Sequence, residues 1–253
     1  MLLHRQFVEI FHLLFLRQLA QGQDRTRFTV KGGCNLRFFF RSIRYSEDLD
    51  LDVSNISTGT LKNKVDRILD APALAIPLRA KGIEVVSISA PKQTETTQRW
   101  KMGLSIDGQS TTIRTKIEFS RRDGQSDEPL VEAIDGGLCR AYGLMAPVIQ
   151  HHGGQTALMQ KIRALIGRPE TQARDVFDLH LLRSQLPTLP GLAPDLRGLG
   201  DKATERVLSL SYDDYLSQVV AYLVPEQGEA FADQTVWEAM QLEVVEMLQE
   251  MAR

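Results

Sequence analysis

The sequence has few cysteines, no long apolar run and almost no net charge, and each absence excludes a class of protein. Two cysteines in 253 residues are too few for a disulfide scaffold or a cysteine-rich zinc site. Glu9 and His12 interrupt the apolar stretch from Phe7 to Leu16, so it is shorter than the roughly 18 residues of a membrane span. We therefore expect no membrane segment, no export signal and a cytoplasmic protein.

Neither sign of charge dominates, because 30 basic residues face 32 acidic ones. This balance excludes a globally basic nucleic-acid-binding protein but leaves room for a local basic cleft. From Glu226 onward the chain carries seven acids, and Arg253 is its only base there. We therefore expect any polyanion to bind nearer the N-terminal half.

Apolar periodicity predicts the order of elements typical of an α+β (mixed α/β) protein. We expect helices near residues 3–20, 34–40, 59–80, 156–166, 173–182 and from 233 onward, and strands near 28–30, 49–53, 83–88, 100–106 and 112–120. Asp107-Gly108 predicts a hairpin turn between the last two strands. This order indicates a sheet-containing core over residues 1–140 and a helical C-terminal domain over 141–253.

A pair of glycines follows the first predicted strand. Gly32 and Gly33 allow a tight turn and a close approach of the backbone to a ligand. A helix beginning at Cys34 would direct free N–H groups at a phosphate. Because a glycine pair also occurs in any tight turn, this pattern on its own favours the ordinary turn.

Three aspartates alternate with apolar residues along the next strand. Asp48, Asp50 and Asp52 are two positions apart, so they share one face of an extended strand. Carboxylates this close repel one another unless a cation lies between them, and Mg²⁺ often uses one or two carboxylates together with substrate phosphates. A charged edge strand is the alternative. Because the aspartates follow the glycine pair by about fifteen residues, we favour metal binding.

The strand near 112–120 offers a third carboxylate. Its alternation places Lys116 and Glu118 on the polar face. Glu118 could complete a three-carboxylate cluster with Asp48 and Asp50, with Lys116 as a neighbouring cation. An ordinary exposed Lys/Glu pair is the alternative.

A second charged constellation lies in the predicted helices of the C-terminal half. Arg174 and Asp178 are four residues apart and share a helix face, and Asp175 lies one turn from Asp178. Lys161 and Arg168 could hold a triphosphate by charge. Spacing alone favours a salt-bridged helical hairpin.

Two further features suggest chemistry only weakly. His151 and His152 are adjacent, and adjacent side chains do not converge on one metal ion in a helix, so we predict a polar loop there. Cys34 could be a nucleophile, but the order of residues alone does not indicate a Cys–His arrangement, and its place in the glycine turn predicts a backbone role.

Together these segments resemble the AbiEii/AbiGii-type nucleotidyltransferase toxins of the DNA polymerase β-like nucleotidyltransferase superfamily. The resemblance is carried by VKGGCNLRFFFRSIRYSEDLDLDV, by KIEFS, and by KIRALIGRPETQARDVFDLHLL. The matching residues are Gly32, Gly33, Arg44, Ser46, Asp48 and Asp50 in the first segment and Lys161, Arg174, Asp175 and Asp178 in the last. The family usually has Ser or Thr where this chain has Cys34, and a thiol is the weaker hydrogen-bonding group.

The resemblance implies a polymerase β-like core with a mixed sheet and Mg²⁺-dependent transfer from a nucleoside triphosphate. It implies metal binding by Asp48 and Asp50, with Glu118 as a third ligand, and phosphate binding by the turn at Gly33-Cys34 and by Lys161. Either Glu118 or Asp178 would serve as the base for an acceptor hydroxyl. Positioning and charge stabilisation would provide most of the catalysis.

The resemblance also implies a biological setting. The protein would be the toxin of a toxin–antitoxin or phage-defence system, with a separate antitoxin, and RNA such as the 3′ end of tRNA would be the acceptor. Arg37, Arg41 and Arg44 are candidate RNA contacts. Two alternatives stay open, namely a non-catalytic nucleotide- or partner-binding protein of the same fold and a nucleotidyltransferase acting on a small molecule.

Overall fold

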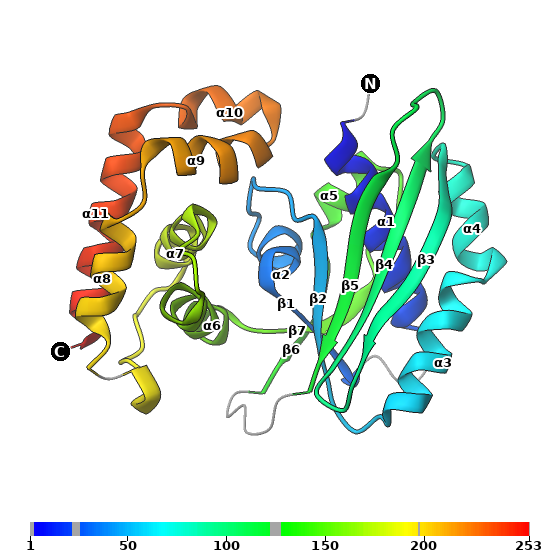
Figure 1. Cartoon of the computed structure of the whole chain (residues 1–253), viewed down its shortest axis with the longest axis horizontal. Coiled ribbons are helices and arrows are strands. Elements are labelled where there is room, and N and C mark those ends of the chain that lie inside the picture. Colours follow the sequence, from blue (N-terminus) through cyan, green and yellow to red (C-terminus); the bar gives the residue numbers. More distant parts are fainter. Residues whose placement is uncertain (1–2, 22–25, 122–127, 197, 253) are drawn as a thin grey trace. The chain divides into compact units, whose positions relative to one another are not determined.

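The chain folds into two compact units. This computed structural model describes residues 3–21, 26–121, 128–196 and 198–252 (Figure 1). Unit 1 consists of Met1–Arg41 and Tyr45–His152, and unit 2 of Ser42–Arg44 and Gly153–Arg253. No helix within the described ranges is long and apolar enough to cross a membrane.

Unit 1 is built on one mixed sheet. Its helices are α1 (His4–Leu19), α2 (Gly32–Phe39), α3 (Thr58–Leu69), α4 (Pro72–Arg79) and α5 (Gly136–Ala141). Its strands are β1 (Phe28–Lys31), β2 (Asp48–Val53), β3 (Ile83–Gln93), β4 (Thr97–Ile106), β5 (Ile113–Ser120), β6 (Leu130–Ala133) and β7 (Val148–His151).

The sheet has the strand order β3-β4-β5-β2-β1-β7-β6. The β2–β5 and β1–β7 pairs are parallel, and the other neighbouring pairs are antiparallel. The predicted hairpin at Asp107-Gly108 joins β4 to β5. The predicted boundary after residue 140 falls inside unit 1, because β7 pairs with β1 and so belongs to the sheet.

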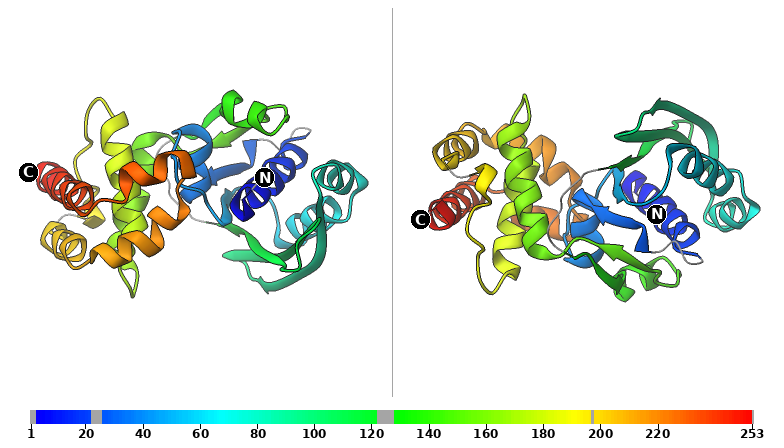
Figure 2. Two further views of the ribbon diagram at one scale, coloured as in Figure 1. Left: turned by 90° about the horizontal axis from the view of Figure 1, so that it is seen from above. Right: turned by 90° about the horizontal axis from the view of Figure 1, so that it is seen from below.

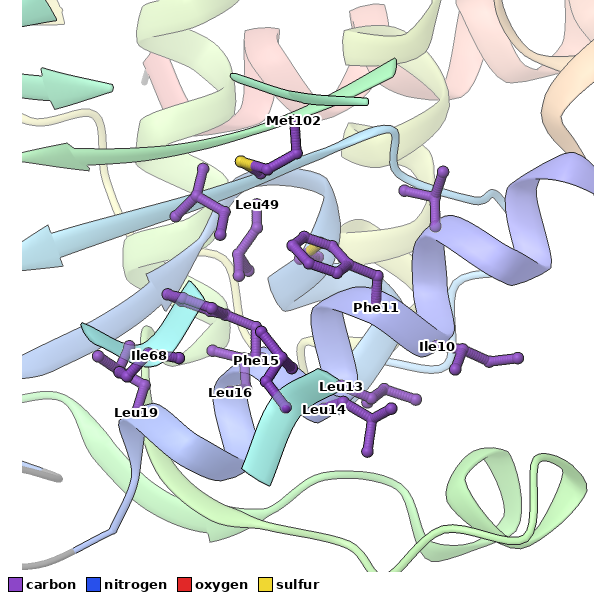
Figure 3. Close-up of a cluster of buried hydrophobic side chains, with 14 of the residues drawn as sticks. Ile10, Phe11, Leu13, Leu14, Phe15, Leu16, Leu19, Leu49, Ile68 and Met102 are labelled. Carbon is purple, nitrogen blue, oxygen red and sulfur yellow. The ribbon is translucent and has the colours of Figure 1, made fainter. Parts of the chain in front are cut away.

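One face of the sheet is covered by α1, α3 and α4 (Figures 1 and 2). Leu49 of β2 and Met102 of β4 point from the sheet toward α1, which contributes Phe11 and Phe15 (Figure 3). These side chains are buried, and the burial of apolar area stabilises the layer. Because side chains alternate along a strand, the neighbours of these residues are turned to the opposite face, here called the open face.

Unit 2 is helical. It contains α6 (Gly154–Gly167), α7 (Ala173–Gln185), α8 (Gly200–Leu208), α9 (Tyr212–Gln218), α10 (Pro225–Phe231) and α11 (Gln234–Ala252). The segment Ser42–Arg44 groups with these helices because the Val224 amide donates to the Ile43 carbonyl at 3.0 Å and Arg44 forms a β-bridge with Leu223. A sheet-containing unit followed by a helical one confirms the predicted α+β fold class.

Candidate active site

The predicted aspartates lie on the open face of β2. Burial alternates along Asp48–Val53, with the three aspartates half-buried and the intervening residues buried. Asp48 is paired in register with Lys116 of β5, and Asp50 with Glu118 of β5 and Lys31 of β1. The structure therefore confirms the shared face that period-two alternation predicts.

The glycine turn lies close to the Asp50 carboxylate. Helix α2 begins at Gly32, two residues earlier than predicted, and Gly32 has a φ of +66°. A Cβ added at Gly32 would lie 3.2 Å from Oδ2 of Asp50. A side chain is thus disfavoured at Gly32 by both backbone conformation and lack of space. The N-terminus of α2, where free N–H groups favour an anion, stands beside one of the predicted metal-binding carboxylates.

We expect Gly32→Ala to damage both stability and activity. The strained φ costs of the order of 1–2 kcal/mol, and the new methyl group pushes against the Asp50 carboxylate. The measurements are thermal denaturation and nucleotide transfer. Gly59→Ala is the control, because a Cβ at this helical position meets no atom within 4 Å. Equal effects from both variants would show that the turn is not specially constrained.

Charged side chains of both signs surround Asp48 and Asp50. The Lys116 ammonium lies 2.9 Å from Oδ2 of Asp48. Burial raises the pKa of Asp50, and the neighbouring Asp48 and Glu118 carboxylates add to this rise, whereas Lys116 and Lys31 act against it. A carboxylate in this setting is stabilised when a further cation approaches. The pair Asp48 and Asp50 therefore fits Mg²⁺, which often takes one or two carboxylates together with substrate phosphates.

Glu118 does not join the two aspartates. Its Oε2 accepts a hydrogen bond from Nε of Arg99 on β4 at 2.6 Å. Among the described residues, no three His, Cys, Asp or Glu side chains are grouped so as to hold one metal ion. The structure therefore does not assemble the predicted three-carboxylate cluster, because the cross-strand arginine holds the third carboxylate.

Asp52, the third aspartate of β2, has cationic and histidine partners of its own. Lys31 Nζ lies 2.5 Å from Oδ1 of Asp52, and His152 Nε2 lies 2.8 Å from Oδ2. Burial alone would raise the pKa of Asp52, but the bonds from His152 and Lys31 hold it below its ordinary value. Lys31 directly precedes the glycine turn, so the ion pair with Asp52 holds in place the residue from which the turn begins.

The polar loop predicted at His151 and His152 is wrong. Both side chains are buried, because β7 inserts this segment into the sheet beside β1. Nδ1 of His151 lies 3.0 Å from Oδ1 of Asn35, its ring stacks on Phe39 with centroids 3.7 Å apart, and Asn35 Nδ2 donates to the His152 carbonyl at 2.9 Å. The two histidines thus attach α2 to the sheet.

Cys34 is buried behind the turn. Its thiol donates to the Asp48 carbonyl at 3.2 Å, and Ser46 Oγ donates to the same carbonyl at 2.9 Å. Burial raises the pKa of the Cys34 thiol well above its ordinary value, and the carboxylates of Asp50, Glu9 and Asp48 add to the rise. A thiol in this state is a poor nucleophile, in agreement with the predicted backbone role.

The second constellation is a buried ion cluster in unit 2. Asp178 is fully buried and accepts hydrogen bonds from the Arg44 guanidinium, the closest at 2.8 Å, and Lys161 Nζ lies 2.6 Å from its Oδ2. Lys161 Nζ also lies 3.2 Å from Oδ1 of Asp175, and Arg168 Nε lies 3.1 Å from Oδ2. Asp178 thus has Arg44 and Lys161 as partners rather than the predicted Arg174, because Ser42–Arg44 packs into unit 2.

The surroundings of Asp178 do not suit a general base. Burial alone would raise its pKa, but Arg44 and Lys161 together hold it below the ordinary value. A base needs access to its proton donor and a pKa near the operating pH. Asp178 has neither feature in this structure, so a charge-compensating role fits it better.

Two of the three arginines predicted to contact RNA are engaged inside the protein. Nε of Arg37 donates to Oε1 of the buried Glu9 at 2.7 Å, and Arg44 binds Asp178. Arg41 is 84% exposed at its side chain and lies 3.3 Å from the Asp135 carboxylate. The prediction is therefore wrong for Arg37 and Arg44, since their guanidinium groups neutralise buried carboxylates.

Three solved structures resemble this chain along nearly its whole length. A structure from H. pylori whose name suggests a nucleotidyltransferase has 24% identity and a TM-score of 0.65, covering 97% of this chain and 93% of its own. JHP933 from Helicobacter pylori has 21% identity and a TM-score of 0.54, with 96% and 90% covered. MenT4, a nucleotidyltransferase toxin from Mycobacterium tuberculosis, has 18% identity and a TM-score of 0.63, with 98% and 84% covered.

A comparison with curated protein sequences found no match. The three structural similarities establish the fold, a mixed sheet with helices, in agreement with the predicted fold class. A model of the family described as nucleotidyl transferase AbiEii toxin, type IV TA system, matches residues 14–252, a range that holds both charged constellations. The chain therefore belongs to the AbiEii nucleotidyltransferase toxin family of type IV toxin–antitoxin systems, and it is a nucleotidyltransferase.

Proposed function

We propose that this nucleotidyltransferase depends on Mg²⁺ and transfers a nucleotide from a nucleoside triphosphate to an RNA acceptor such as the 3′ end of tRNA. The observation that supports the proposal is the closeness of the Asp50 carboxylate to the turn at Gly32, where an added Cβ would lie 3.2 Å from Oδ2. Free N–H groups that suit a phosphate and carboxylates that suit a divalent cation stand side by side there. A nucleoside triphosphate with its metal needs both.

The proposal assigns a role to each of the site residues of unit 1 described above. Asp48 and Asp50 hold the metal, and the start of α2 binds the phosphates through its backbone. Bound Mg²⁺ would offset the negative charge that develops on the transferring phosphoryl group. Asp52, by holding Lys31, keeps the turn in place. The buried Cys34 supports the Asp48 backbone instead of contacting phosphate.

The proposal includes the biological setting. A cytoplasmic toxin of phage defence would be held inactive by a separate cognate antitoxin, as the type IV toxin–antitoxin description of the family suggests. Modification of an RNA that the cell needs would account for toxicity.

Incubation with each labelled nucleoside triphosphate and total cellular RNA tests the proposal. We expect label in the RNA fraction when Mg²⁺ is present and none when a chelator replaces it. Mg²⁺ and the triphosphate together should also stabilise the protein, by about 2.7 kcal/mol at a hundred times the Kd. Label in a small molecule without added RNA would contradict the acceptor, and undiminished transfer in chelator would contradict the metal.

A further inference from the structure

A groove on the open face begins at Asp48 and runs away from the glycine turn. Its cavity has a volume of about 890 Å³, and it lies wholly in unit 1 over β3, β4 and β5. Lys101, Arg114 and Lys116 line it, together with serine and threonine hydroxyls, and Asp48 is the one acid in the lining. Such a surface suits phosphate oxygens, which accept hydrogen bonds from cations and hydroxyls alike.

The strand register sets these groups in a straight row. Ser89 of β3 is paired with Lys101 of β4, Lys101 with Lys116 of β5, and Lys116 with Asp48 of β2. Directly paired residues point to the same face, and neighbouring strands lie about 4.8 Å apart. The row therefore spans roughly 14 Å, which is long enough for an extended ligand that ends at Asp48.

Two of the three cations of the groove, Lys101 and Arg114, lack partners of the opposite charge within the described residues, whereas Lys116 pairs with Asp48. Lys101 and Arg114 are exposed, and within the residues that the structure describes neither forms an ion pair. Lys101 stands directly opposite Lys116, and like charges in that position destabilise a sheet. An anionic ligand lying between them would relieve the repulsion, so the arrangement points to a bound polyanion.

The position of β2 in the sheet separates this groove from the triphosphate site. The order β5-β2-β1 places Asp48 and Asp50 between the groove on one side and the turn after β1 on the other. In nucleotidyl transfer the attacking hydroxyl of the acceptor and the leaving pyrophosphate of the donor lie on opposite sides of the reacting phosphorus. If the triphosphate binds at the turn, the groove is on the side from which the acceptor reaches the reacting phosphorus.

We propose that the backbone phosphates of the acceptor RNA lie in this groove, contacted by Lys101 of the row and by Arg114 beside it, with the terminal hydroxyl directed at Asp48. This inference rests on the proposed function and replaces the arginines predicted from the sequence. Lys101 and Arg114 act as positioning residues, and they bind without regard to base sequence because phosphates carry no base information.

The test substitutes Lys101→Gln and Arg114→Gln together, leaving Lys116 in place because it lies against Asp48. The control is Lys62→Gln with Arg67→Gln, which also removes one lysine and one arginine charge, but from exposed positions on α3 outside the groove. Binding of a labelled single-stranded RNA with a free 3′-hydroxyl is measured by anisotropy over a range of salt concentrations. We expect about tenfold weaker binding for the groove variant and a salt dependence reduced by about 1.4 in logarithmic slope, with no change for the control.

Steady-state transfer then separates this inference from the proposed function. We expect the groove variant to raise KM for RNA while KM for the triphosphate and kcat stay near the wild-type values. A raised KM for the triphosphate instead would place the donor in the groove and overturn the inference. RNA binding unaffected by the groove variant would also overturn it, even if Mg²⁺-dependent transfer is observed. If the wild-type protein binds RNA through the groove but transfers nothing, the proposed function fails by itself.

Discussion

Asp48→Asn and Asp50→Asn should each reduce nucleotide transfer by at least about a hundredfold, because loss of a metal-binding carboxylate forfeits several kcal/mol of transition-state stabilisation. Both residues lie on the open face of β2, and the Asp50 carboxylate lies so close to Gly32 that a Cβ there would be 3.2 Å from its Oδ2. Asparagine keeps the shape of the side chain and removes only its charge. The measurement is incorporation of labelled nucleotide at saturating triphosphate and Mg²⁺.

The Asp50 variant should lose activity while gaining stability. Because the pKa of Asp50 is raised in the folded protein, protonation of this group favours folding, and that contribution is lost as the pH rises through the folded-state pKa. At a pH above the folded-state pKa and without metal, ionised Asp50 destabilises the folded protein, and Asp50→Asn removes this destabilisation. We therefore expect a higher melting temperature for this variant in chelator, and a smaller difference from the wild type in Mg²⁺.

Asp70→Asn is the matched control for these two variants, since Asp70 is an exposed carboxylate at the end of α3. It should change neither transfer nor melting temperature. Full activity in both Asp48→Asn and Asp50→Asn would exclude these residues as metal ligands. A lower melting temperature for Asp50→Asn in chelator would show that the carboxylate is already compensated by its lysine neighbours.

Local patterns in the sequence sufficed for the elements from α1 to β5 and for part of the site, but not for β6 and β7. Alternation over two positions places Asp48 and Asp50 on one face whatever the strand pairs with. The glycine pair marked the turn, although α2 begins at Gly32, two residues earlier than predicted, and Gly32 itself has a positive φ. The face of a strand and the position of a turn depend on residues close in sequence, so both can be predicted from the local sequence alone.

Features that depend on strand register and long-range packing could not be predicted. Glu118 was assigned to the correct face, but its partner Arg99 follows from the β4–β5 register. His152 and Asp52 are separated by 100 positions, and no local pattern links them. The pairing of Arg44 with Asp178 across 134 positions likewise reassigns an arginine from a predicted RNA contact to a buried ion cluster.

That cluster leads to the largest expected loss of stability. Asp178→Ala should destabilise the protein by about 3–5 kcal/mol, because Arg44 and Lys161 are buried and lose the carboxylate between them. For a chain of this size the melting temperature should fall by roughly 10 °C, as measured by far-UV circular dichroism. Asp195→Ala is the control, since Asp195 pairs with Arg163 in the same unit but at an exposed position, where such a pair contributes little to stability.

The pH dependence and a double variant decide whether charge compensation is the cause. The pKa of Asp178 lies below its ordinary value of 3.8, so its contribution to stability is present above the unfolded-state pKa and is lost as the pH falls through the folded-state pKa. The wild type should therefore lose stability in acid more steeply than Asp178→Asn. Arg44→Met combined with Asp178→Leu should recover much of the loss, because it removes the Arg44 charge together with the Asp178 carboxylate and leaves Lys161 its second partner, Asp175. If the double variant is no more stable than Asp178→Ala, the packing of these side chains rather than their charges stabilises unit 2.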